Sequence, residues 1–282
     1  MKNETPDFGK KGPQYGNWIP YSLVMVSLAA ALALLFAGNA LKNVVGWLSS
    51  VLTVFSLGAL VYAYYMLRAR MALSYTGGQV QSYVLDDVIE RLRKSSFSGK
   101  GMLLDIGCGN GALTIKAAKK WPQLRIVGID SWGKLWGYSQ SQCEENAKLE
   151  NVAAHVSFRA GDAAKLSFVD ETFDGAVSNF VFHEVRSQPD KLALFQEMLR
   201  VLKPGGALVC LEFSTPPNRL WRALYGFYLK HLIPFWGGLI TGDRDGFVYL
   251  ARSIKAFPDQ QGLADMMRAA GFERVNWKNY TG

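Results

Sequence analysis

Cysteine is scarce in this chain of 282 residues, which has only Cys108, Cys143 and Cys210 and no C-x-x-C pair. An odd number of widely spaced cysteines argues against a disulfide framework and indicates a reducing compartment. The spacing typical of a structural metal site is also missing, so no metal is predicted.

Acidic residues are outnumbered, since 31 Lys and Arg face 23 Asp and Glu, for a net charge of +8. Such an excess fits binding to nucleic acid, attraction to an anionic membrane surface, or solubility alone. The part of the chain beyond residue 75 shows no basic stripe. We therefore predict no nucleic-acid partner.

Charge is absent from two long stretches near the N-terminus, residues 18–38 and 44–67. Each is longer than the ~20 residues that cross the hydrocarbon of a bilayer. Only "NALKN" connects them, which predicts a two-helix transmembrane hairpin with a tight turn at one membrane face. A signal peptide and a pair of buried helices in a soluble protein are the alternatives.

Basic residues flank this hairpin unevenly. Lys10 and Lys11 precede it and Arg68 and Arg70 follow it, whereas the turn holds Lys42 alone. The positive-inside rule then places the N-terminus and everything after Arg70 in the cytoplasm. Aromatic residues near the ends of the two stretches are typical of an interfacial belt; they are Trp18, Tyr21, Trp47, Tyr62, Tyr64 and Tyr65.

From about residue 75 onward, helical and strand-like segments alternate, a pattern typical of a parallel sheet covered by helices. Helices are predicted at 80–97, 112–122, 134–150 and 191–203, and strands at 101–107, 125–130, 156–162, 173–180 and 205–213. Ligands on such sheets bind beyond the carboxyl ends of the strands. The residues that follow each strand are therefore the candidates for a site.

A glycine-rich turn, "LLDIGCGNGAL", joins the first of these strands to a helix. Glycines let a ligand approach the backbone closely, but enzymes that bind dinucleotides use the same device. The second strand ends in Asp130, a carboxylate able to accept both hydroxyls of a ribose, and Asp162 follows the third strand. Both features suit an adenosine-containing cofactor and still permit NAD.

The series "LDIGCGNG", "GID", "AGDA", "FDGAVSN" and "LRVLKPGGAL" resembles the motifs of class I S-adenosylmethionine-dependent methyltransferases, and the likeness covers residues 78–282. It implies a Rossmann-like sheet with helices on both faces. It also implies that the turn holds the methionine part of S-adenosylmethionine, Asp130 the ribose and Asp162 the adenine. The implied cofactor-binding residues are Asp105, Gly107, Cys108, Gly109, Asp130, Ser131, Trp132, Asp162, Ala163 and Asn179. Trp132 is predicted either to stack on the adenine or to pack in the core.

The segment "RVLKPGGALVCLEFS" and the residues after it are similar to the ubiquinone/menaquinone C-methyltransferase family. This resemblance implies a ring carbon of a quinol as acceptor, a capping insertion at about 215–260, and a final strand near the end of the chain, where the family's sixth strand turns into a seventh. The family's usual N-terminal segment is replaced here by a different linker or lid, residues 68–77. The predicted divisions are thus a tail at 1–17, the hairpin at 18–67, this linker, and a methyltransferase domain at 78–282.

Methylation of a ring carbon needs a base, and three residues are candidates. His183 and Glu184 follow the fourth strand, and His231 lies in the capping insertion. Glu184 is alternatively a helix cap or a partner of Arg186, and most histidines are not catalytic. The aromatic and basic helix "RLWRALYGFYLKHLIPFWGGLI" is either packed in the core or amphipathic and in contact with lipid.

We therefore predict a membrane-anchored methyltransferase whose catalytic domain is cytoplasmic and whose partners are the lipid bilayer and a hydrophobic small-molecule or lipid substrate. Transfer to a phospholipid amine, or to a sulfur, oxygen or metalloid atom of a small hydrophobic molecule, is the alternative. A nucleic-acid methyltransferase is disfavoured, because "SNFVFHEV" stands where an N-P-P-Y-like motif is expected. A protein that binds the cofactor without catalysis is the remaining alternative.

Overall fold

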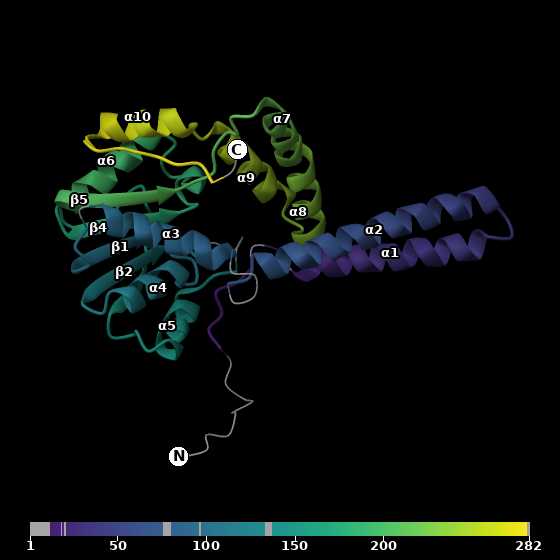
Figure 1. Cartoon of the computed structure of the whole chain (residues 1–282), viewed down its shortest axis with the longest axis horizontal. Helices are drawn as coiled ribbons and strands as arrows, with labels where there is room; N and C mark the ends of the chain where they lie inside the picture. The colour runs from purple at the N-terminus through teal and green to yellow at the C-terminus, as the bar shows by residue number, and fades with distance from the viewer. Residues whose placement is uncertain are drawn as a thin grey trace, which may run out of the picture. The chain divides into compact units, whose positions relative to one another are not determined.

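The computed structural model describes residues 12–17, 19, 21–75, 80–95, 97–132 and 137–280, and these form two compact units (Figure 1). The α/β unit comprises the described residues of 1–15, 85–230 and 249–282, and the hairpin unit comprises those of 16–84 and 231–248. Predictions that rest on Lys10, Lys11, Trp18, residues 76–79 or residues 133–136 lie outside the described residues.

Both predicted apolar stretches are helices, with bounds that differ from the prediction. Helix α1 spans Tyr21–Leu41 and helix α2 spans Gly46–Ala72. Helix α2 thus continues five residues past its predicted end into the predicted linker. The residues there are Arg, Ala and Met, which are strong helix formers, and no glycine or proline interrupts them.

Small residues form the interface between α1 and α2. Ala31 and Ala63 are 1% and 2% exposed, and the Ser56 hydroxyl donates to the Ala31 carbonyl at 2.8 Å. A Cβ on Gly38 would lie 3.2 Å from the Ser49 carbonyl oxygen, so the two backbones approach closely there. Many large apolar side chains of this pair of helices are exposed, among them Phe36 and Phe55.

The sheet of the α/β unit has five parallel strands in the order β3-β2-β1-β4-β5, which confirms the predicted fold class. The strands are β1 (Gly101–Ile106), β2 (Leu124–Asp130), β3 (Val156–Ala160), β4 (Phe173–Asn179) and β5 (Leu202–Leu211). The helices beside them are α3 (Val80–Lys94), α4 (Ala112–Lys120), α5 (Gln140–Leu149), α6 (Lys191–Val201) and α10 (Gln260–Ala270). Strand order reverses between β1 and β4, the switch point at which such sheets bind ligands.

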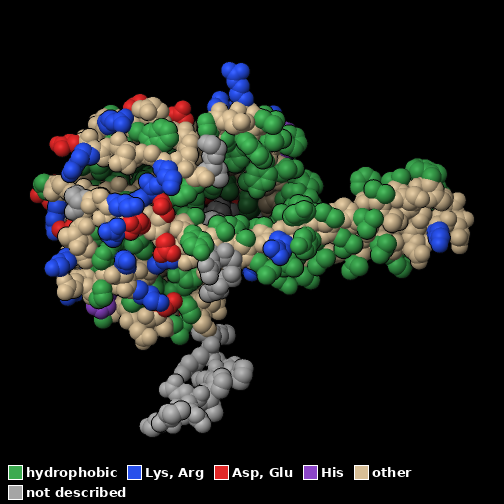
Figure 2. All heavy atoms as spheres, viewed as in Figure 1, with side chains coloured by type: hydrophobic (Ala, Val, Ile, Leu, Met, Phe, Trp, Pro, Cys, Tyr) green, Lys and Arg blue, Asp and Glu red, His purple; other side chains and the backbone are tan. Residues whose placement is uncertain are grey.

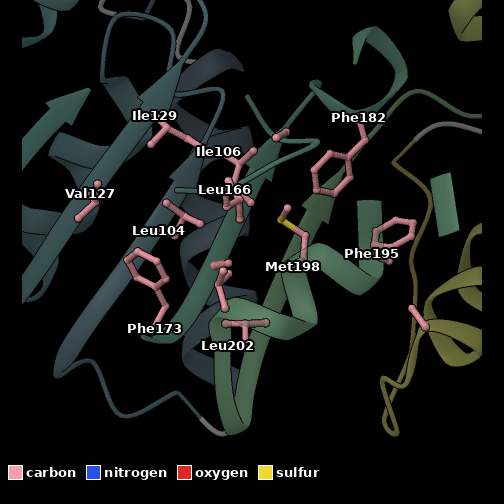
Figure 3. Packing of buried hydrophobic residues seen from close by; sticks show 14 of the residues in the cluster. Leu104, Ile106, Val127, Ile129, Leu166, Phe173, Phe182, Phe195, Met198 and Leu202 are labelled. Atoms are coloured by element: carbon pink, nitrogen blue, oxygen red, sulfur yellow. The ribbon is translucent and has the colours of Figure 1, made fainter. Parts of the chain in front are cut away.

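Helices cover both faces of the sheet. Successive residues of a strand point to opposite faces. Leu104 and Ile106 of β1 belong to the cluster that includes Phe195 and Met198 of α6 (Figure 3). The intervening Asp105 accepts a hydrogen bond from Thr114 of α4, so α4 covers the other face. This packing fixes the β1–α4 turn above the switch point.

Helix α5 begins at Gln140, six residues later than predicted. Ser139 caps it by accepting the Gln142 amide at 3.2 Å, and Gly137 has a φ of 64°, which interrupts the helical pattern before that cap. Strand β5 begins three residues earlier than predicted, and its pairing with β4 contains a register shift between Phe173 and Gly175.

The predicted final strand is wrong, because residues 272–280 contain no strand. Polar contacts of this segment go to helices instead of the sheet. Arg268 of α10 donates to the Val275 carbonyl at 3.1 Å, and Gln260 donates to the Asn279 side chain at 2.8 Å. The Val275 carbonyl is a main-chain group that a sixth strand would have directed toward a neighbouring strand.

The predicted capping insertion is largely helical. Helix α7 (Arg219–Phe227) belongs to the α/β unit and is followed by a π-helical turn, Tyr228–Leu232. Helix α8 (Ile233–Thr241) belongs to the hairpin unit, where Trp236 stacks on Tyr62 of α2 with ring centroids 5.7 Å apart. Helix α9 spans Arg244–Ala256.

Candidate cofactor and acceptor site

The glycine turn after β1 adopts a conformation that only glycine accommodates easily. Gly107, Gly109 and Gly111 have φ values of 70°, 57° and 80°. A Cβ on Gly107 would lie 2.1 Å from a methyl carbon of Val181, which follows β4 across the switch point. Val181 therefore packs directly against the backbone of the turn, and a side chain at position 107 would clash with it.

Hydrogen bonds connect this turn to β2, to Trp132 and to α5. The Gly107 and Cys108 amides both donate to the Ile129 carbonyl of β2, at 2.8 and 3.0 Å. The Gly109 carbonyl accepts from the Trp132 indole at 2.9 Å and from the Cys143 thiol at 3.1 Å. Cys108 itself is buried, and a hydrogen bond with Cys143 together with burial raises the pKa of its thiol, so it is not a reactive thiolate.

Asp130, the predicted ribose ligand, lies directly beside the glycine turn. Its two carboxylate oxygens accept the Gly109 and Trp132 amides, each at 2.8 Å. Burial raises the pKa of the carboxyl group, while these backbone bonds oppose the rise. The Ser131 amide also bonds to this carboxylate, which still has the capacity to accept a further donor. The adjacent Ser131 is exposed.

Trp132 has a φ of 43°, rare for a bulky residue, and its indole N–H is used by the turn. The Trp132 ring is thus fixed beside Gly109 through its indole nitrogen. Tyr138 lies on the same turn, because a Cβ on Gly109 would lie 3.3 Å from its ring. Stacking of Trp132 on an adenine stays a prediction.

Asp105 is 1% exposed and lies below the turn. Its pKa is raised to about 7, chiefly by burial and also by the neighbouring Asp130 charge, although a 2.5 Å hydrogen bond from the Thr114 hydroxyl opposes the rise. A buried carboxyl group of this kind is a natural counter-ion for an ammonium group.

Asp162 and Ala163 follow β3, as predicted. One carboxylate oxygen of Asp162 accepts both the Ala164 amide and the Ser187 hydroxyl at 2.9 Å. Ser187 comes from the segment after β4, so this bond joins the ends of two strands. Ala163 is 7% exposed and belongs to the core cluster.

The end of β4 carries polar atoms that lack partners. The side-chain oxygen of Asn179 is buried and has no hydrogen bond in the described part of the chain, and the same holds for Nε2 of His183. Phe180, between them, has a φ of 59° and stacks on Phe213 with ring centroids 4.5 Å apart. Strained backbone and unpaired buried polar atoms together are typical of a ligand site.

His183 is paired with Glu212, which sequence reasoning missed. Nδ1 of His183 lies 2.7 Å from a Glu212 carboxylate oxygen, and the two side chains are 1% and 2% exposed. The Phe182 amide donates to the other oxygen at 2.6 Å. Glu184 lies 3.8 Å from Nε2 of the same histidine. In the sequence, Glu212 could have been noticed as the single acidic residue directly after the apolar strand, in "VCLEF".

His231 is exposed and belongs to the hairpin unit, so the structure describes it separately from His183. Its predicted catalytic role stays a prediction. Sequence reasoning also missed Asn146 of α5, which is fully buried and donates to the Asn110 carbonyl of the glycine turn at 2.9 Å. Nothing in the local sequence pattern distinguishes this asparagine from a surface residue of an amphipathic helix.

A doubly wound parallel sheet with a glycine turn after β1, a carboxylate at the end of β2 and a second carboxylate after β3 fits a class I S-adenosylmethionine-dependent methyltransferase. Residues 82–282 match the model of the ubiE/COQ5 methyltransferase family, and the chain belongs to this family. It is thus an enzyme that uses S-adenosylmethionine.

Several proteins resemble this chain. It is 43% identical over 183 residues to the ubiquinone/menaquinone biosynthesis C-methyltransferase UbiE of Stutzerimonas stutzeri, covering 64% of this chain and 68% of the relative. It is 37% identical over 179 residues to a demethylmenaquinone methyltransferase of a Mycobacterium species, covering 64% and 74%. The crystal structure of the [4+2]-cyclase SpnF superposes with a TM-score of 0.51 at 25% identity, covering 72% and 62%.

Proposed function

We propose that this enzyme transfers a methyl group to a ring carbon of a quinol that resides in the membrane, and that α1 and α2 anchor it there with its α/β unit in the cytoplasm. The observation that carries the proposal is the presence, in one chain of the ubiE/COQ5 family, of a glycine-turn cofactor site and a helix pair with large apolar side chains on its outside. Relatives named for ubiquinone and menaquinone biosynthesis support a quinol acceptor.

The surface of the hairpin supports membrane anchoring. Helices α1 and α2 are long and apolar enough to cross a bilayer. Phe36 and Trp47 are 78% and 71% exposed, and Figure 2 shows hydrophobic side chains over the visible face of this pair. A soluble protein rarely leaves so much apolar surface exposed, whereas membrane helices pair through small residues and direct large ones to lipid.

Helix α7 adds a second apolar surface. None of its residues is buried, and four large apolar side chains on it are more than half exposed; they are Leu220, Trp221, Leu224 and Phe227. Arg219 and Arg222 flank them. This combination is typical of a helix that lies at the membrane surface, and it favours the lipid-contacting prediction for this segment over core packing.

The residues around the glycine turn fit S-adenosylmethionine. We assign its amino-acid part to the turn and to the buried acceptors Asp105 and Asn179, and its ribose to Asp130. Asp162, which is exposed at the end of β3, is assigned to the adenine. When bound, the cofactor supplies an electrophilic methyl group. The protein then has to orient the acceptor, exclude water and remove a proton.

His183 is the residue that we propose as the base. The Glu212 carboxylate accepts a hydrogen bond from Nδ1–H of His183, and this tautomer leaves the lone pair on Nε2. A phenolic proton of the acceptor would move to this nitrogen, which increases the electron density of the ring. Glu184, 3.8 Å from Nε2, is partly exposed and offers a route for that proton to solvent.

A second function is favoured by the surroundings of Tyr138. Burial raises the pKa of this tyrosine, and the charges of Asp130 and Glu184 raise it further, so two carboxylates and an aromatic ring share one region. Aromatic rings beside acids bind cationic amines. N-methylation of a phospholipid amine is therefore the alternative.

One experiment separates these functions. The purified protein is incubated with methyl-labelled S-adenosylmethionine and a total membrane lipid extract, and the labelled products are identified by mass spectrometry. We expect the label on a quinone ring. Label in a phospholipid headgroup would contradict the quinol proposal and support the alternative. Asp130→Ala serves as the control that lacks cofactor binding.

A further inference from the structure

Residues 12–15, which precede the first apolar helix, belong to the α/β unit, and we call them the N-terminal strap. The main-chain amide of Gln14 donates to the side-chain oxygen of Asn146 at 2.7 Å, and the side-chain nitrogen of Asn146 donates to the main-chain carbonyl of Gln14 at 2.9 Å. Tyr15 is 4% exposed, and its hydroxyl donates to Glu150 at 3.0 Å. The strap is thus bound to α5 through two successive residues.

The same asparagine binds the glycine turn. The Asn146 amide nitrogen also donates to the Asn110 carbonyl at 2.9 Å, so its two N–H groups go to two carbonyls from distant parts of the chain. Its side-chain oxygen accepts from Gln142 in addition to Gln14. With 0% exposure, this side chain has every donor and acceptor occupied without water.

Such a buried amide is costly to leave unsatisfied. If the strap detaches, Asn146 loses both bonds to Gln14, and water or a rotation of the side chain must replace them. The Asn110 carbonyl then loses a fixed partner. Since the carbonyl of Gly109 is already held by Trp132 and Cys143, Asn110 is the position at which the turn depends on the strap.

We propose that the N-terminal strap and Asn146 are positioning elements for the cofactor, which hold the glycine turn in the conformation that binds S-adenosylmethionine. The proposal rests on the assignment of that turn to the cofactor. It makes the segment before the membrane hairpin a part of the catalytic unit. In the sequence, only Gly16 lies between Tyr15 of the strap and Asn17. The Asn17 side chain donates to the Arg70 carbonyl at 2.9 Å, so the strap is followed directly by a residue that is bonded to α2.

The test compares Gln14→Pro with Gln14→Ala in the full-length protein. Both strap bonds to Asn146 use the main chain of residue 14, so alanine keeps them, whereas proline removes the N–H donor. The affinity for S-adenosylmethionine is measured by isothermal titration without any acceptor. We expect the proline variant to bind about three- to tenfold more weakly and the alanine variant to match the parent.

A second variant removes the bond to the turn. Asn146→Asp keeps an acceptor for the Gln14 amide but has no donor for the Asn110 carbonyl or for the Gln14 carbonyl, and we expect it to weaken cofactor binding as well. Hydrogen exchange at the Gly109 and Gly111 amides should accelerate in both variants. A lowered melting temperature with unchanged affinity and unchanged exchange would overturn the proposal, since it would show a purely structural strap.

An equal loss of affinity in the proline and alanine variants would also overturn the proposal, because it would exclude the main-chain bonds as the cause. The titration needs no methyl acceptor. A wrong assignment of the quinol would therefore leave its result unchanged, and a failure of this inference would leave the lipid-extract experiment unchanged.

Discussion

The Asp130 carboxylate accepts the Gly109 amide of the glycine turn at 2.8 Å, and its replacement is the clearest test of the cofactor site. Asp130→Ala should weaken S-adenosylmethionine binding well over tenfold, since hydrogen bonds to a charged group contribute ~1.5 to 3 kcal/mol each. Isothermal titration measures the effect, and circular dichroism checks that the variant is folded. Arg125→Ala provides a matched control, because Arg125 is exposed on the same strand β2 and its replacement leaves the carboxylate in place. Unchanged affinity in Asp130→Ala would remove the ribose assignment.

Asp105 should make the stability of the cofactor-free protein depend on pH. Burial raises its pKa to about 7 from an ordinary value of 3.8. Between these values the folded state holds a proton that the unfolded state has released, so stability falls as pH rises through this window. We expect Asp105→Asn to remove a decrease on the order of a few kcal/mol between about pH 4 and pH 7. Urea unfolding across this range measures it, and an identical slope in parent and variant would contradict the prediction.

Variants of His183 and Glu212 distinguish a loss of catalysis from a loss of cofactor binding. His183→Gln should lower kcat by roughly 10²- to 10⁴-fold, which is typical for loss of a general base, without changing the affinity for S-adenosylmethionine. Glu212→Gln should lower kcat less and change the pH profile of kcat, because the histidine tautomer is no longer enforced. Steady-state kinetics across pH measures both variants. If His183→Gln retains full kcat, His231 and Glu184 become the remaining predicted bases.

At the scale of elements, the segments on either side of the hairpin decide whether the α/β unit works alone. A protein that begins at Met71 lacks the N-terminal strap, helix α1 and nearly all of helix α2, and we expect it to bind S-adenosylmethionine more weakly than the full chain in the same detergent. Adding residues 12–15 through a long flexible linker should restore part of the affinity. Circular dichroism must show that both shortened forms are folded. Equal affinity of the Met71 form and the full chain would mean that the hairpin is a tether and that the strap is dispensable.

Element bounds were predictable where local chemistry decides them. Apolar periodicity and the positions of glycine predicted the five strands and the β1–α4 turn. The start of α5 was missed, because the cap at Ser139 competes with a helical pattern that extends further back. The final strand was missed because a strand needs a partner edge, and the segment 272–280 instead bonds to Arg268 and Gln260.

At the scale of the whole molecule, the hairpin predicts a topology. A reporter fused before Met1 and a reporter fused after Gly282 should lie on the same side of the membrane, because an even number of spans returns the chain to the side on which it began. The basic residues that flank the hairpin predict that this side is the cytoplasm. A reporter inserted in the turn at Lys42 should lie on the opposite side. Accessibility to a membrane-impermeant label measures all three. Termini on opposite sides would mean that only one of the two helices spans the membrane.

The sequence by itself determined what depends on neighbours along the chain. Runs without charge, alternating apolar segments and the spacing of the glycines specify two long apolar helices, a parallel α/β sheet and the turn beside Asp130, because each follows from residues a few positions apart. The order of the motifs was sufficient to indicate the methyltransferase class.

Tertiary structure alone decided the contacts between residues far apart in sequence. Glu212 meets His183 because the parallel pairing of β4 and β5 brings the ends of both strands together. Asn146 meets Gln14, 132 residues away, because α5 packs between the strap and the glycine turn. Neither pairing has a local signal, although Glu212 stands out as a single acid after an apolar strand, since a buried hydrogen bond depends on which surfaces the folded chain brings together and not on the residues that flank each partner.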